Sequence, residues 1–125
     1  MTVNDIIDIL KAKVLVEGDL NEEVKMACGS DMMSDVLAFV KDQSVLLTGL
    51  MNPQVIRTAE MMDMHCVIFV RGKGNSVNEE VLKLAELKDI TVLATPYRMF
   101  TACGLLYSSG LRGGCELPGE EAKMP

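Results

Sequence analysis

The stretch Cys66-Val-Ile-Phe-Val70 decides the fold, because all five of its side chains are apolar. A strand with one solvated face alternates apolar and polar residues, whereas a strand covered on both faces reads as a continuous apolar run. The stretch therefore predicts an interior strand of a parallel sheet that has helices packed on both faces. The glycine-containing segment Arg71-Gly-Lys-Gly-Asn75 follows it and is expected to be the loop at its carboxyl end.

Strands and helices alternate along the rest of the chain. Short apolar runs predict strands, and apolar residues that recur at spacings of three and four predict helices. The further expected strands are 13–16, 24–28, 44–48 and 91–94; the expected helices start at Thr2, at Ser30 or Asp31, at Asn52-Pro53, at Ser76 and after Thr95-Pro96. Asn52 before a proline is a strong start signal, and Ser76 with Glu79 has the spacing of a capping box.

This order of elements predicts an α/β three-layer sandwich around a mainly parallel sheet of about five strands. The chain has 125 residues, which is the usual size of a single domain, and we expect that domain to occupy residues 1–109. From Gly110 onward the composition shifts to glycine, proline and charge. Residues 110–125 are therefore expected to form a flexible tail.

Composition excludes several classes of function. Lys and Arg number 12 against 18 Asp and Glu, whereas nucleic-acid-binding proteins normally carry a basic surface. No apolar run approaches the roughly 20 residues of a membrane span, and the N-terminus lacks a signal-peptide pattern. We therefore expect a cytoplasmic protein that binds neither nucleic acid nor membrane. The sequence has one histidine and four cysteines without a C-x-x-C pair, so we expect no metal site and no cofactor.

The candidate ligand site lies at the carboxyl edge of the sheet, where ligands bind in folds of this class. Glycines, cations and the N-terminal ends of helices are expected to meet there, which favours an anionic ligand. The candidate ligand-binding residues are Gly29, Ser30, Asp31, Thr48, Gly49, Arg71, Lys73, Gly74 and Thr95. For Arg71 to Asn75 an alternative stays open, namely a tight turn whose charges are merely solvated, because the spacing is not that of a P-loop.

No catalytic residue is predicted. His65 is expected as a surface or helix-end residue at the opposite edge of the sheet, and no nucleophile with a base and an orienting group can be assembled.

The methionines are a separate signal. Met32-Met33 and the Met61–Met64 region place at least one side chain on an outward face, which predicts a homodimer with these helix ends as contacts.

The chain resembles the DRTGG domain family over about residues 2–109. The resemblance rests on Ala12-Lys-Val-Leu15, Gly29-Ser-Asp-Met-Met-Ser-Asp-Val-Leu37, the strand to Thr48-Gly49, Cys66-Val-Ile-Phe-Val70 and Ile90-Thr-Val-Leu-Ala-Thr95. The motif that gives the family its name is degenerate, since the region after Asp19 reads Asn21-Glu-Glu-Val-Lys25. The resemblance implies a fold similar to the N-terminal domain of HPr kinase and a regulatory role, as in the accessory modules of phosphotransacetylases and some pyrophosphatases. It also implies a stand-alone type associated with iron-only hydrogenase gene clusters.

These observations predict a non-catalytic regulatory or ligand-sensing domain that binds an anionic metabolite or a nucleotide. The resemblance adds a link to iron-only hydrogenase function and a hydrogenase-related protein partner. Two alternatives stay open: a structural dimerisation adaptor without a small-molecule ligand, and a small enzyme that uses Lys, Arg and backbone amides. A saturable ligand would favour sensing over the adaptor, and turnover of that ligand would favour the enzyme.

Overall fold

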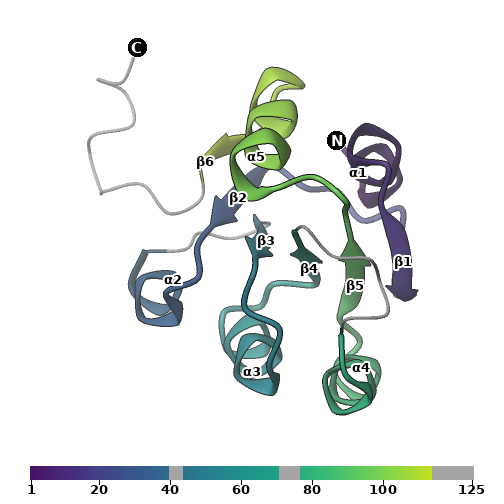
Figure 1. Ribbon diagram of the computed structural model, residues 1–125, viewed down its shortest axis with the longest axis vertical. Coiled ribbons are helices and arrows are strands. Elements are labelled where there is room, and N and C mark those ends of the chain that lie inside the picture. Colours follow the sequence, from purple (N-terminus) through teal and green to yellow (C-terminus); the bar gives the residue numbers. More distant parts are fainter. Residues whose placement is uncertain (40–43, 71–76, 114–125) are drawn as a thin grey trace.

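The structure is a computed structural model that describes residues 1–39, 44–70 and 77–113, and within them six strands form one mixed sheet (Figure 1). The strands are β1 (Lys13–Val16), β2 (Met26–Gly29), β3 (Ser44–Thr48), β4 (Cys66–Phe69), β5 (Thr91–Ala94) and β6 (Arg112–Gly113). The helices are α1 (Val3–Leu10), α2 (Met33–Phe39), α3 (Pro53–Met61), α4 (Glu79–Leu87) and α5 (Met99–Ser108).

The strand order is β1-β5-β4-β3-β2-β6, so β4 lies in the interior of the sheet, as its apolar sequence predicts. The pairings from β5 through β4, β3 and β2 to β6 are parallel, whereas β1 is antiparallel to β5. The expected sheet of about five mainly parallel strands is thus corrected to a mixed sheet of six among the described residues. The likeness to the N-terminal domain of HPr kinase stays a prediction.

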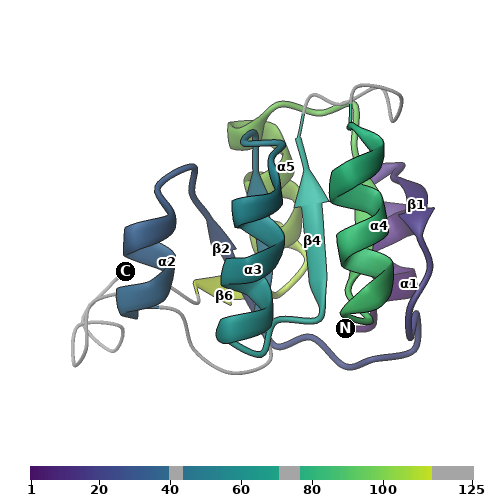
Figure 2. The same ribbon diagram turned by 90° about the horizontal axis from the view of Figure 1, so that it is seen from below.

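Two layers of helices cover the sheet. Helices α2, α3 and α4 lie on one face, in front of the strands in Figure 2, and α1 and α5 lie on the other. Alternate residues of β4 enter the two apolar cores: Val67 and Phe69 pack in the core under α2, α3 and α4, and Cys66 and Ile68 pack in the core under α1 and α5. The pleat of one continuous apolar strand therefore supplies both cores, which confirms the α/β sandwich.

Capping side chains determine where the helices begin. Thr2 caps α1 in a capping box with Asp5, and Asn52 caps α3 with Pro53 at the first helical position, as predicted. The prediction for α4 is wrong, since Asn78 is the cap and its side chain accepts a hydrogen bond from the backbone N–H of Val81 at 3.0 Å. Asn78 adopts the extended backbone that a cap needs, and Ser76 lies outside the described residues.

Two further boundaries differ from the expectation. The strand expected at 24–28 begins at Met26, because the backbone N–H of Val24 donates instead to the carbonyl of Met1 at 2.7 Å. The chain also stays in the fold beyond residue 109: Leu111 is buried, and Arg112–Gly113 pair with β2. Gly110 makes this return possible with a φ of +116°, which favours glycine. A tail over the remaining residues, 114–125, lies outside the described residues.

We expect Leu46→Ala to lower the free energy of unfolding by about 2–5 kcal/mol, because Leu46 of β3 is fully buried and its removal leaves a cavity. The measurement is chemical denaturation followed by circular dichroism. Leu87→Ala at the end of α4 is the matched control, since Leu87 is 79% exposed and should change the free energy by less than about 0.5 kcal/mol. Equal effects of the two substitutions would contradict this assignment of the core.

Candidate functional site

A cleft of about 460 Å³ opens at the carboxyl edge of the sheet, where β2 and β3 end and α5 begins. It is lined by Gly29, Ser30, Asp31, Gly49, Val70, Arg98, Met99 and Phe100. Four of the residues predicted from the sequence, Gly29, Ser30, Asp31 and Gly49, are therefore brought together. They come from two loops that are separated in sequence and adjacent in the sheet, because β2 pairs with β3 in parallel.

Asp31 joins these two loops. One of its carboxylate oxygens accepts hydrogen bonds from the hydroxyl of Thr48 at 2.9 Å and from the backbone N–H of Gly49 at 2.7 Å. The hydroxyl of Thr48 also accepts from the backbone N–H of Leu50 at 3.1 Å. Thr48 is fully buried and does not line the cleft, so its part is to hold Asp31 in place.

Thr95 serves the other side of the sheet. Its fully buried hydroxyl donates to the backbone carbonyl of Leu10 at 2.8 Å, at the end of α1, and accepts from the backbone N–H of Tyr97. Thr95 is therefore a packing and turn residue in this structure, and it does not line the cleft. The three remaining predicted residues, Arg71, Lys73 and Gly74, lie outside the described residues.

The cleft contains a cation and an aromatic ring that the sequence reasoning missed. Arg98 is the N-cap residue of α5, and Phe100 in the first turn is 90% exposed. The sequence predicts a helix after Pro96, but the helix begins only at Met99. The signal that could have found both residues is their position directly after β5, which places them at the carboxyl edge of the sheet.

The start of α5 carries a partial positive charge. Among the described residues, no side chain caps it by a hydrogen bond, and its first turn has no acidic residue. Helix N-termini have unsatisfied backbone N–H groups and a partial positive charge. In the lining of the cleft, Arg98 adds a full positive charge and Asp31 a negative one. The cleft can therefore hold an anionic group of a ligand near α5 and hydrogen-bond donors of the same ligand near Asp31.

Gly29 has a packing role that its sequence position does not reveal. A β-carbon built on Gly29 would lie 2.7 Å from Sγ of Cys103 and 3.2 Å from Sδ of Met99. Both side chains belong to α5, which packs against β2 at this point. The missing side chain of Gly29 therefore lets α5 approach the sheet and bring Arg98 and Phe100 to the cleft.

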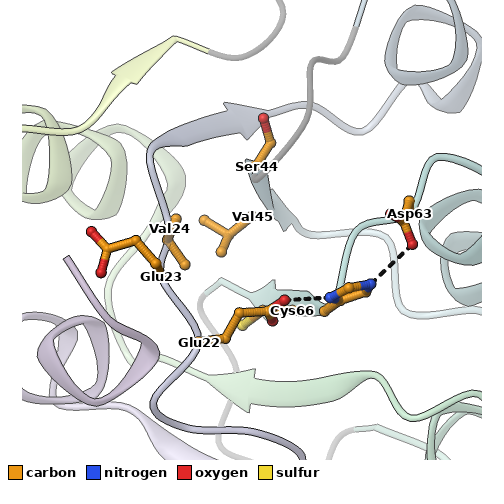
Figure 3. A pocket seen from close by; sticks show the side chains of 8 residues that line it. Glu22, Glu23, Val24, Ser44, Val45, Asp63 and Cys66 are labelled. Atoms are coloured by element: carbon orange, nitrogen blue, oxygen red, sulfur yellow. Dashed lines mark hydrogen bonds and ion pairs between the residues drawn. The ribbon is translucent and has the colours of Figure 1, made fainter.

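A second cavity, of about 320 Å³, lies at the opposite edge of the sheet (Figure 3). His65 lies here on the protein surface, as expected, between the carboxylates of Glu22 and Asp63. Cys66 also lines this cavity, but complete burial raises the pKa of its thiol to about 12, so it offers no thiolate at neutral pH. Burial likewise raises the pKa of the Cys103 thiol.

Metal-binding and membrane-spanning features are both absent from the described residues. Across 1–39, 44–70 and 77–113, no three His, Cys, Asp or Glu side chains come together so that they could hold a metal ion. Within the same ranges, each helix is too short or too polar to cross a bilayer.

Comparison with known families identifies the family to which this domain belongs. The family model of the DRTGG domain matches residues 5–109, which is most of the chain. The chain belongs to the DRTGG domain family. This match confirms the resemblance that the sequence suggests; a stand-alone, hydrogenase-associated type remains a prediction.

One related sequence and one solved structure contain a similar domain. The chain is 25% identical over 113 residues to a cobalt-dependent inorganic pyrophosphatase of Clostridium perfringens (strain 13 / Type A), covering 86% of this chain and 20% of that protein. A solved structure of the CBS and DRTGG domains of the regulatory region of Clostridium perfringens pyrophosphatase, complexed with the activator diadenosine tetraphosphate, matches with a TM-score of 0.68. The identity is 18%, and the match covers 93% of this chain and 50% of that chain.

We expect Gly29→Ala to destabilise the DRTGG domain by about 1–3 kcal/mol, because the new methyl group overlaps Cys103. In a double-mutant cycle with Cys103→Ala, much of this loss should be recovered, since the clashing sulfur is gone. Gly104→Ala, on the same helix as Cys103, is the control: apart from its own helix backbone, no atom of the described residues lies within 4 Å of its added β-carbon, so it should be neutral or slightly stabilising. A fully stable Gly29→Ala variant in urea titration would contradict the packing role.

Proposed function

We propose that this DRTGG domain is a non-catalytic regulatory domain that binds a nucleotide in the cleft at the carboxyl edge of the sheet. The observation that carries the proposal is the pairing of Arg98 with Phe100 at the start of α5. An arginine next to an uncapped helix N-terminus suits a phosphate group. A phenylalanine ring that is 90% exposed beside it offers a flat surface on which a base can stack.

The related proteins support both parts of the proposal. The solved regulatory region that shares this fold is complexed with an activator, diadenosine tetraphosphate, which combines bases with a phosphate chain. The chain spans only a fifth of the pyrophosphatase and half of that solved chain, so no pyrophosphatase activity is carried over. The proposed nucleotide-binding role of this protein rests on its own domain fold and on the residues that line its own cleft.

A non-catalytic role fits the chemistry of the described residues. The buried thiol of Cys66 has a pKa raised to about 12, and His65 lies at the edge of the sheet opposite the cleft. A small enzyme that uses only cations and backbone amides is the alternative, and turnover of a bound nucleotide, followed by chromatography, would establish it.

Several predictions from the sequence are kept as part of this proposal. Arg71, Lys73 and Gly74 are proposed to add to the same anion site, because they follow the β4 strand that neighbours β3. The cytoplasmic location is kept on the composition of the chain, and the link to iron-only hydrogenase function and to a hydrogenase-related partner on the family resemblance alone. A double substitution of Arg71 and Lys73 to Ala tests the first of these separately from the cleft.

We expect Arg98→Ala and Phe100→Ala each to weaken nucleotide binding by about 10- to 100-fold. A charge-assisted contact contributes about 1.5–3 kcal/mol and base stacking about 1–3 kcal/mol, and about 1.4 kcal/mol corresponds to tenfold in affinity. The measurement is isothermal titration calorimetry with ATP and diadenosine tetraphosphate. Inorganic triphosphate, which has no base, should lose affinity on Arg98→Ala and be insensitive to Phe100→Ala.

Three controls isolate the roles of charge and ring. Arg57→Ala removes an exposed cation from α3, and Tyr107→Ala removes an exposed ring from the far end of α5; both should bind like the wild type. Phe100→Leu keeps an apolar side chain but cannot stack, so it should behave like Phe100→Ala. Equal nucleotide binding by the wild type and by both alanine variants would show that the binding site lies elsewhere than in this cleft. Absence of binding by the wild type would favour the adaptor.

The adaptor alternative is supported by exposed methionines. Met32 is 58% and Met61 is 73% exposed, whereas their neighbours Met33 and Met64 are buried. We expect the wild type to sediment as a dimer at tens of micromolar, and Met32→Lys with Met61→Lys to sediment as a monomer, because charges cannot be buried in an apolar contact. Tyr107→Lys, on the opposite helical layer, should leave the dimer intact. A monomeric wild type would remove this alternative.

A further inference from the structure

His65 connects two segments that are far apart in the sequence. It is the only histidine of the chain and follows the turn after α3. Its Nδ1 contacts Oε1 of Glu22, and its Nε2 lies 3.0 Å from Oδ1 of Asp63. Glu22 belongs to the connection between β1 and β2, and Asp63 to the turn between α3 and β4. In Figure 3, dashed lines mark these two contacts at the labelled side chains of Glu22 and Asp63.

The two contacts demand a particular protonation state. An ionised carboxylate only accepts hydrogen bonds, and a neutral imidazole has only one N–H donor. Both ring nitrogens can donate only in the imidazolium form, so a neutral ring must turn one unprotonated nitrogen toward a carboxylate oxygen. We propose that His65 is a proton-operated clamp: protonated, it fastens the β1–β2 connection to the α3–β4 turn through Glu22, and deprotonation releases Glu22 while the ring stays beside Asp63 of its own turn.

The clamped connection also holds the start of α1. The backbone N–H of Val3 donates to the carbonyl of Glu22 at 3.2 Å, and that of Asn4 to the carbonyl of Leu20 at 2.9 Å. The backbone N–H of Val24 donates to the carbonyl of Met1 at 2.7 Å. Release of Glu22 from His65 therefore loosens the segment on which the first turn of α1 rests.

The two carboxylates that contact His65 favour its protonated form. Besides Glu22 and Asp63, the surrounding residues include Glu23, which pairs with the Met1 amine at 2.8 Å, and Asp19 and Asp89 on the adjoining cleft. Among the described residues that line the adjoining cleft, Lys88 is the opposing cation, but its ammonium group pairs with Glu60 at 3.0 Å. The nearby thiol of Cys66 is neutral, because burial raises its pKa to about 12.

The direction of the pKa shift of His65 determines how the clamp depends on pH. The hydrogen bonds to Glu22 and then to Asp63 raise the pKa of His65 above its ordinary value of 6.5, against a smaller effect of burial. A group whose pKa is higher in the folded state stabilises that state fully below its unfolded pKa. The clamp is therefore closed below about pH 6.5 and opens as the pH rises through the pKa of the folded protein.

The first experiment follows the proton NMR signal of the single imidazole of the full-length chain from pH 5 to pH 9. We expect the wild type to titrate above 6.5, and Glu22→Gln and Asp63→Asn each to lower that midpoint, because each removes one carboxylate. Glu23→Gln is the matched control, since this neighbour pairs with the Met1 amine and not with His65. Asp63 is 87% exposed and has a φ of +56°, which asparagine tolerates, so Asp63→Asn should fold even if Glu22→Gln does not.

The second experiment measures the clamp itself by hydrogen exchange at the amides of Val3, Asn4 and Val24, corrected for intrinsic rates. In the wild type, their protection should fall as the pH passes the midpoint measured by NMR, whereas in His65→Gln it should not change over that interval. A wild-type midpoint at or below 6.5, or one that neither carboxylate substitution lowers, would overturn the proposal. So would pH-independent protection in the wild type.

Discussion

Burial of the three central strands on both faces is the constraint on which the rest of this structure depends. Every residue of β3, β4 and β5 is buried, and successive residues enter opposite cores. Each fully buried aliphatic or aromatic side chain contributes about 1.5–3 kcal/mol, so neither face can be left to water. Helices are therefore required on both sides. Because each crossover returns its strand in parallel, α3, α4 and α5 all follow the carboxyl ends of buried strands, where the cleft lies.

Helix α5 joins the fold to the proposed function. It packs against β2 because Gly29 has no side chain to hold it away. The same approach brings Arg98 and Phe100 beside Asp31 and Gly49. The start of α5 is uncapped and its ring is exposed, features that add little to stability and that suit a ligand. Close packing of α5 on Gly29 thus positions the exposed residues of the cleft, as expected where a rigid scaffold presents a binding site.

The His65 clamp lies at the other edge of the sheet and is built from the same elements. Strand β2 runs from the connection that carries Glu22 to the cleft residues at and after Gly29. Helix α3 begins after the loop that follows Gly49 and ends just before the turn that carries Asp63. The two sites therefore occupy opposite ends of one strand and one helix. A domain with the proposed nucleotide cleft at one end and the proposed proton-sensitive contact at the other would be suited to regulation.

The sequence by itself determined what depends on local pattern. Short apolar runs identified β3, β4 and β5 as strands, the continuous run of β4 identified it as buried on both faces, and capping residues identified the starts of α1 and α3. These signals act within a few residues. The carboxyl edge and four residues of its cleft, Gly29, Ser30, Asp31 and Gly49, followed from topology rules applied to that pattern.

Only the tertiary structure decided the rest, because the remaining features depend on partners far away in the chain. The antiparallel placement of β1, the strand β6 and the hydrogen bond from Thr95 to Leu10 each require residues more than 70 positions apart to meet. Arg98 and Phe100 became candidates once α5 was seen to begin at the cleft, and His65 once Glu22 was seen beside it. The sequence defines the chemistry of each side chain, but tertiary packing determines which side chains come into contact.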